Sequence, residues 1–192
     1  MRQLRYRSFR RTGHAGLVAA ALALVVFAPS LAAESGLEYR VKAAFLFNFA
    51  RFVEWPSNSF DNAAAPLHLC VLEPDPFGTT LDQTVADKTV DKHPLLLRRT
   101  ARLSDTQGCH ILFVSMDASE PLPEVLGALE NRPILTVSEG DEFLRAGGII
   151  GFVLDQGKVR FHVNLQAADG ASLKISSKLL NVASRVYPSG DR

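Results

Sequence analysis

Two cysteines and two neighbouring histidines are the residues of this chain best suited to covalent or metal chemistry. Cys70 and Cys109 are the only cysteines, and His68 and His110 stand close to them in the sequence. Two thiolates and two imidazoles are a ligand set that zinc accepts, whereas in an oxidising compartment one pair of cysteines usually forms a disulfide. In an extended strand, Cys109 and His110 would point to opposite faces, so both could not easily reach one ion. We therefore favour a disulfide over free thiols and over a metal site.

Motifs of known enzyme classes are missing from the sequence. It contains no G-x-S-x-G, H-E-x-x-H, P-loop or G-x-G-x-x-G pattern. A single histidine in a strand is more often a hydrogen-bonded structural residue than a catalytic base. The histidines that follow the first 33 residues are all isolated: His68, His93, His110 and His162. We therefore expect no enzyme activity, no cofactor and no metal.

A group of aromatic and polar residues is a candidate binding site. Aromatic side chains near the end of a predicted helix would form an apolar floor, and polar side chains from later predicted strands would offer hydrogen-bond donors at its edge. Such a site suits a planar or anionic small molecule. Core packing and solvent exposure are the competing explanations. The residues are Phe47, Phe49, Phe52 and Trp55 for the floor, and Arg160, Asn164 and Lys174 for the edge.

The floor residues depend on one very apolar helix. The sequence predicts a helix over residues 34–53, ended by Trp55-Pro56. Its apolar stripe runs through Leu37, Val41, Phe45, Phe49 and Phe52 and includes Asn48, while Leu46 and Phe47 lie off it. A helix with so many phenylalanines is too apolar for an ordinary surface helix. It is either covered on two sides or lines a pocket or a partner surface.

Short strands alternate with short helices through the middle of the chain. Strands are expected over residues 67–72, 95–98, 110–115 and 133–137. Helices are expected over residues 75–86, opened by Asp75-Pro76, over 121–130, and from a cap at Ser138 to about residue 146, where Gly147-Gly148 ends it. This alternation predicts a central, mostly parallel sheet covered by helices. We expect a single α/β domain over residues 34–192.

A β-hairpin is predicted near the C-terminus. Residues 149–154 and 158–165 form its arms, and turn-forming residues 155–157 separate them. Along the second arm Val159, Phe161 and Val163 share one face, and the opposite face is either solvated or one wall of a polar site. That polar row consists of Lys158, Arg160, His162 and Asn164. A final short strand should follow at residues 173–175. A C-terminal helix capped by Ser176 or Ser177 should then turn Leu179, Val182, Ala183 and Val186 inward.

The first 33 residues have the pattern of a secretory signal peptide. They carry five arginines and no acid, followed by an apolar run, Pro29 and small residues. The run of about 14 residues is shorter than a membrane anchor requires, and Arg10-Arg11 fits a twin-arginine signal poorly. Beyond Ala33, 16 basic residues remain against 20 acidic ones, a formal net charge of −4. No basic excess is left to neutralise phosphates, which argues against binding to nucleic acid.

The sequence resembles the YfiR family, which was long described as a domain of unknown function. The main match is residues 40–56, RVKAAFLFNFARFVEWP. Further matches in family order are residues 134–138, 147–150, 160–165 and 173–180. Cys70 and Cys109 occupy the positions of a disulfide found in the family. Some members carry a second cysteine pair around the Gly147-Gly148 turn, where this chain has Leu144 and Gly151, so we expect no redox sensing through a second bridge.

The resemblance implies a function as a binding protein. It implies a periplasmic α/β protein that represses an inner-membrane diguanylate cyclase by binding its periplasmic segment, and so limits cyclic-di-GMP and biofilm formation. Sequestration by an outer-membrane lipoprotein would relieve the repression. Alternatives are a periplasmic sensor for a small ligand with another protein partner, and a hydrolase with an unrecognised site. A homodimer is compatible with the sequence.

Overall fold

The computed structural model describes residues 31–189, so residues 1–30 of the predicted signal peptide lie outside the described residues. A sheet of eight strands, in the order β10-β8-β7-β6-β5-β2-β4-β3, forms the centre of the fold. All neighbouring strands are parallel except β3–β4 and β7–β8. The strands are β2 (Leu67–Leu72), β3 (Thr89–Val90), β4 (His93–Thr100), β5 (Ile111–Val114), β6 (Leu135–Glu139), β7 (Ile150–Asp155), β8 (Lys158–Asn164) and β10 (Arg185–Tyr187).

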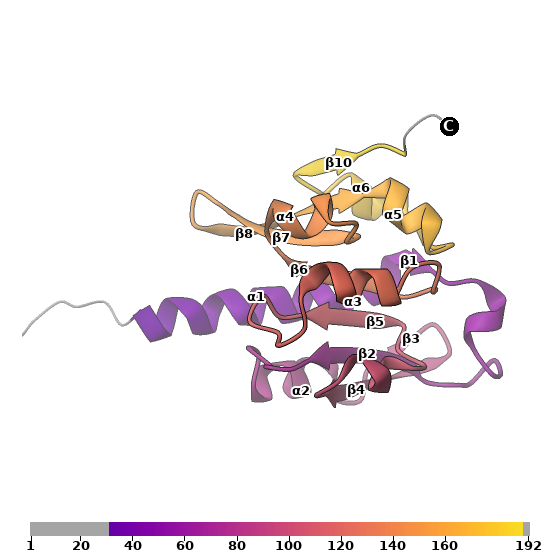
Figure 1. Cartoon of the computed structure of the whole chain (residues 1–192). Helices are drawn as coiled ribbons and strands as arrows, with labels where there is room; N and C mark the ends of the chain where they lie inside the picture. Colours follow the sequence, from indigo (N-terminus) through magenta and orange to yellow (C-terminus); the bar gives the residue numbers. More distant parts are fainter. Residues whose placement is uncertain (1–30, 190–192) are drawn as a thin grey trace, which may run out of the picture.

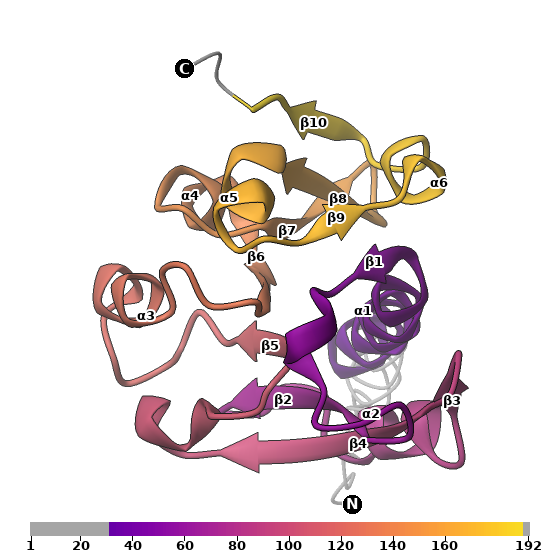
Figure 2. The ribbon, with the colours of Figure 1, turned by 90° about the vertical axis from the view of Figure 1, so that its right-hand side faces the viewer.

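Helices cover both faces of this sheet (Figures 1 and 2). One face carries α1 (Leu31–Phe52) and α2 (Thr79–Val85), and the other carries α3 (Leu122–Ala128) and α4 (Gly140–Arg145). The chain then adds α5 (Leu165–Gly170) and α6 (Ser177–Leu180). A small antiparallel pair joins β1 (Val53–Glu54) to β9 (Lys174–Ile175), and single 3-10 turns lie at Ser57–Ser59 and Leu103–Thr106. The prediction of one α/β domain with a mostly parallel sheet is confirmed.

The C-terminal half of α1 packs directly on the sheet. Leu46 and Phe49 have no exposed surface, and the Phe49 ring lies 5.7 Å from that of Phe152 and 5.1 Å from that of Phe161. The predicted stripe is therefore partly wrong, since Leu37 and Val41 are exposed while Leu46 is buried. Each step of four residues turns an α-helix about 40° beyond a full turn, so a stripe from Leu37 to Phe49 drifts by about 120°.

Two residues that were predicted to cap helices make other contacts in the structure. Asp75 accepts a hydrogen bond from the Phe77 amide at 2.7 Å, but α2 begins only at Thr79, after Gly78 with a φ of 52°. Asp75 instead binds the Arg99 side chain of β4 at 2.7 Å. Ser138 lies within β6, and its hydroxyl donates to the Val114 carbonyl at 2.6 Å. Both side chains thus join neighbouring segments of the fold rather than opening a helix.

The C-terminal segment differs most from the sequence-based prediction. The hairpin of β7 and β8 is confirmed, with Gln156 and Gly157 forming its turn at positive φ angles of 49° and 73°. However, α5 follows it directly, and the predicted C-terminal helix is the single turn α6, capped by the Ser176 side chain. Val182 is 59% exposed rather than inward. The Ser184 amide donates to the Phe161 carbonyl, so the chain continues as β10 beside β8 and β9 is not the final strand.

Candidate functional site

A disulfide joins Cys70 of β2 to Cys109, two residues before β5, with 5.9 Å between the two Cα atoms. The prediction of this pair is confirmed, and the alternative metal site of two cysteines and two histidines is wrong because the sulfur atoms are bonded to each other. Both cysteines are buried. The bond links β2 to the segment that leads into the adjacent parallel strand β5, across 39 residues of sequence.

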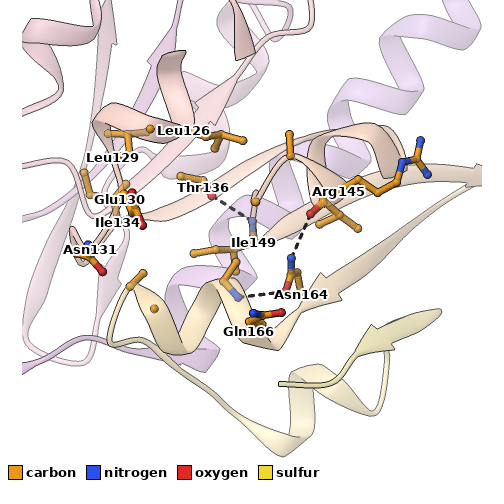
Figure 3. Close-up of a pocket in the computed structure, with 17 residues that line it drawn as sticks. Leu126, Leu129, Glu130, Asn131, Ile134, Thr136, Arg145, Ile149, Asn164 and Gln166 are labelled. Carbon is orange, nitrogen blue, oxygen red and sulfur yellow. Dashed lines mark hydrogen bonds between the residues drawn. The ribbon is translucent and has the colours of Figure 1, made fainter. Parts of the chain in front are cut away.

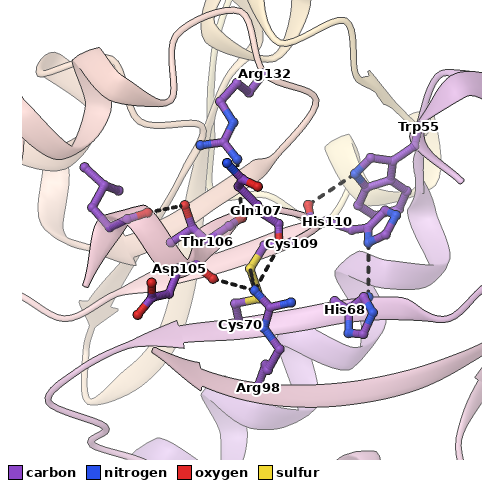
Figure 4. The surroundings of a disulfide bond; sticks show 11 residues. Trp55, His68, Cys70, Arg98, Asp105, Thr106, Gln107, Cys109, His110 and Arg132 are labelled. Carbon is purple, nitrogen blue, oxygen red and sulfur yellow. Dashed lines mark hydrogen bonds between the residues drawn. A yellow bond between two sulfur atoms is a disulfide. The ribbon is translucent and has the colours of Figure 1, made fainter. Parts of the chain in front are cut away.

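Arg98 of β4 holds the loop that precedes Cys109 (Figure 4). Its guanidinium donates to the carbonyls of Asp105 at 2.5 Å and Gln107 at 2.9 Å, and lies 3.6 Å from the Cys109 sulfur. From the other side, Arg132 donates to the Thr106 carbonyl at 3.4 Å. These bonds satisfy carbonyl groups of an irregular segment, so they stabilise the surroundings of the disulfide.

A cluster of three histidines and one phenylalanine, named here the histidine cluster, lies on the side of the chain opposite to the disulfide. Its members are His68, His93, His110 and Phe60. The Phe60 ring stacks between those of His93 and His110, with centroid distances of 3.9 and 4.5 Å. His93 bonds the Ala65 carbonyl at 2.6 Å. The histidine cluster therefore fastens the loop after α1 to the sheet.

The hydrogen bonds of His110 define its protonation. Its Nδ1 accepts from the His68 backbone amide at 3.1 Å, so the proton lies on Nε2, which donates to the Ser59 carbonyl at 3.0 Å. Burial lowers the pKa of His110, and the neighbouring histidines lower it further. Burial likewise lowers the pKa of His68. His110 is thus neutral in this arrangement, because a protonated Nδ1 could not accept the His68 bond.

The seven residues of the predicted binding site do not gather around one hollow. Phe49 belongs to the core and cannot form an accessible floor. The Trp55 indole donates to the His110 carbonyl at 3.2 Å, which places it beside the histidine cluster. Asn164 caps α5 through the Ala167 amide and also donates to the Leu144 carbonyl.

The remaining members lie elsewhere. Phe47 and Phe52 are partly buried, and the Arg51 guanidinium lies 5.9 and 5.7 Å from their ring centres. Arg160 is exposed on β8, where it borders a surface groove together with Leu37 and Val41 of α1. Lys174 lies on β9, opposite Glu54.

A cavity of about 500 Å³ opens where the C-terminal ends of α3 and α4 approach α5 (Figure 3). Both polar and apolar side chains line it. The apolar members include Leu126, Leu129, Ile134 and Ile149, and the polar ones Glu130, Asn131, Arg145 and Gln166. Of the predicted site residues only Asn164 lines it. Sequence reasoning missed this cavity because three stretches that are distant in the sequence, residues 126–136, 144–149 and 164–171, contribute to it. The Gly147-Gly148 end of α4 was the one local signal.

Leu144 and Gly151 lie next to each other beside this cavity. A Cβ atom placed on Gly151 would come within 3.1 Å of the Leu144 Cγ and 2.7 Å of the Gly140 carbonyl oxygen. The Leu144 side chain therefore fills the space where a cross-link between these two positions would lie.

The family of the chain follows from comparison with known proteins. The model of one family, described as YfiR/HmsC-like, matches residues 39–184. The chain belongs to the YfiR/HmsC-like family. The resemblance seen in the sequence is thereby confirmed. The family is known for periplasmic, non-catalytic regulators of diguanylate cyclases that act through partner proteins.

Two solved structures are similar to this chain at low sequence identity. One is a conserved domain protein from Vibrio cholerae, 12% identical with a TM-score of 0.42, for which 66% of this chain and 55% of that chain are covered. Another is an ABC domain in complex with L-Trp from Streptococcus pneumonia, 11% identical with a TM-score of 0.46, covering 80% of this chain and 60% of that chain. This chain thus spans little more than half the length of either. No curated protein matches it.

Over residues 31–189, no helix is both long and apolar enough to cross a bilayer.

Proposed function

We propose that this protein is a periplasmic repressor, which binds the periplasmic segment of an inner-membrane diguanylate cyclase and so limits cyclic-di-GMP and biofilm formation. The observation that carries the proposal is the family match over residues 39–184. The basic, then apolar, pattern of residues 1–33 supports export as a signal peptide. An exported protein meets only the periplasmic side of such an enzyme, so its effect must cross the bilayer through the conformation of the cyclase.

Repression of this kind requires unequal affinity for two states of the cyclase. A protein that binds the inactive state more tightly shifts the population toward it, and tenfold tighter binding corresponds to about 1.4 kcal/mol of coupling free energy. Anything that competes for the same surface would relieve repression. An outer-membrane lipoprotein that sequesters the repressor would act in this way.

Gene deletion in a host that expresses the matching cyclase tests the proposal. Deletion should raise cyclic-di-GMP and surface attachment, and the full chain should restore both. A chain lacking residues 2–33 should not restore them, because it would stay in the cytoplasm. A strain without the cyclase is the control and should not respond. Unchanged cyclic-di-GMP after deletion, with the cyclase expressed, would refute the repressor function.

The cavity beside α5 supports a second candidate function, a periplasmic sensor of a small molecule. Its volume of about 500 Å³ and its mixed polar and apolar lining suit a ligand of modest size. Thermal unfolding of the protein with a panel of amino acids and nucleotides would test this. A saturable rise in melting temperature, together with no effect of gene deletion on cyclic-di-GMP, would favour the sensor over the repressor.

A further inference from the structure

An exposed apolar groove of about 650 Å³ lies between the first half of α1 and the tip of the β7–β8 hairpin. We call it the hairpin groove. Its apolar residues are Leu37 and Val41 from α1 and Leu154 and Val159 from the hairpin. Figure 1 shows both elements extending past the neighbouring strands on the same side of the molecule. The groove is therefore formed by two projecting elements, outside the packed core.

The exposed apolar side chains of the described residues concentrate in this groove. Six large hydrophobic residues are exposed over residues 36–189, and three of them, Leu37, Val41 and Leu154, line it. Leu37 is 61% exposed and Leu154 60%. Isolated exposed apolar residues are ordinary, but a contiguous patch marks an interaction surface.

The hairpin tip also lacks neighbouring strands. β7 pairs with β6 only through Phe152, and β8 pairs with β10 only from His162 onward. Between these residues the hairpin is a two-stranded ribbon, and its Leu154 and Val159 lie directly opposite each other. An isolated two-stranded ribbon is marginally stable in water. A partner that buries the apolar side chains of this ribbon would therefore stabilise the ribbon as well as its own binding.

The edge of the groove carries unpaired positive charge. Lys158 and Arg160 border it, both are exposed, and neither makes an ion pair with another described residue. The one acid in the groove, Glu38, is bound to the buried Lys42. The charge of the edge is therefore complementary to an acidic partner.

We propose that the hairpin groove docks an amphipathic helix of the cyclase's periplasmic segment, whose apolar face is flanked by acidic residues. The proposal rests on the function proposed above. Leu37 and Val41 are four residues apart, so they form a ridge along α1 against which a second helix packs. A second copy of this chain is the less favourable occupant, because a two-fold contact would bring the same basic edge against itself.

Surface variants of the full, exported chain test the docking site. Leu37→Asp and Leu154→Asp should each weaken binding to membrane vesicles containing the full-length cyclase by at least tenfold. Val182→Asp is the matched control, because Val182 is 59% exposed elsewhere on the molecule, and should change binding by less than twofold. The double variant Lys158→Glu/Arg160→Glu changes only exposed charges, so it tests the site even if an aspartate variant unfolds. It should weaken binding and reduce its dependence on salt.

The outcomes separate this proposal from the repressor function. If all three groove variants bind like the wild type while gene deletion still raises cyclic-di-GMP, the groove is not the docking site and the repressor function stands. If the wild-type protein does not bind the cyclase and deletion has no effect, both fail. Sedimentation of the variants shows whether a second copy of this chain occupies the groove instead. Loss of a dimer in Leu37→Asp, with unchanged cyclase binding, would assign the groove to a second copy and overturn the proposal.

Discussion

Acidification should loosen the histidine cluster at a pH set by His110. In the folded protein His110 is neutral, because its Nδ1 accepts the His68 amide bond and its Nε2 donates to Ser59. Burial holds the pKa of His110 below its ordinary value of 6.5. In the unfolded chain the ring takes up a proton near that ordinary value. The unfolded state therefore binds more protons below pH 6.5, and the free energy of unfolding falls as the pH falls.

The size of this effect follows from the number of protons. One proton bound only by the unfolded state lowers the free energy of unfolding by up to about 1.4 kcal/mol per pH unit. His68, whose pKa burial also lowers, adds a second contribution in the same direction. The contribution is complete above about pH 6.5 and is lost as the pH falls toward the lowered pKa of the folded state. Asp82, Asp105 and Asp141, whose pKa values hydrogen bonds lower below 3.8, stay ionised in this range.

Urea unfolding at pH 7.5, 6.5 and 5.5 measures the effect. His110→Asn keeps an acceptor near the position of Nδ1 but does not titrate, so its stability should fall less steeply between pH 6.5 and 5.5 than that of the wild type. Phe60→Leu is the control, since it removes the stacking between His93 and His110 without removing a titrating group. It should lower stability at every pH with little change in slope. Equal slopes for the wild type and His110→Asn would refute this account of the cluster.

Two further predictions concern the core. Replacing Cys70 and Cys109 together with alanine removes a link across 39 residues, which should lower the free energy of unfolding by about 4 kcal/mol on the chain-entropy model; equal urea midpoints for this variant and the oxidised wild type would contradict it. Gly148→Ala would place a Cβ atom 2.1 Å from the buried Phe143 ring, which should cost about 2–3 kcal/mol. Gly127→Ala, where nothing lies within 4 Å, is its control, and similar melting temperatures for the two variants would show that Phe143 moves aside freely.

Elements with a strong local signal could be predicted from the sequence. The strand at Leu67–Leu72 has the predicted boundaries, and the β7–β8 hairpin follows from a turn between two alternating runs. The Cys70–Cys109 pair follows from a count of cysteines. These features depend on composition or on residues close in sequence, which is the information that periodicity and turn chemistry hold.

The candidate site could not be predicted in this way, because it depends on contacts between distant residues. A run of aromatic residues before Trp55 is equally compatible with the lining of a pocket and with a packed core. The contacts of Phe49 with Phe152 and Phe161 show that Phe49 belongs to the core. The Trp55 indole finds its partner 55 residues away, at the His110 carbonyl. A short helix such as α5 depends on the Asn164 cap, which the sequence pattern assigned to the polar row of the strand instead.

The excess apolar character of α1 has two structural origins. Its C-terminal half buries Leu46 and Phe49 against the sheet, so the phenylalanines there need no partner outside the domain. Its N-terminal half projects toward the hairpin, and there Leu37 and Val41 are exposed on a different side of the helix. The predicted apolar stripe, which ran through both halves, therefore combined residues that have different surroundings in the structure. Core packing and a partner surface were competing explanations for the apolar character of the whole helix. The structure shows core packing for the C-terminal half, and a partner surface is the explanation that we propose for the N-terminal half. Substitutions along α1 should therefore separate by position: polar changes at Leu46 should unfold the protein, while those at Leu37 should affect binding alone.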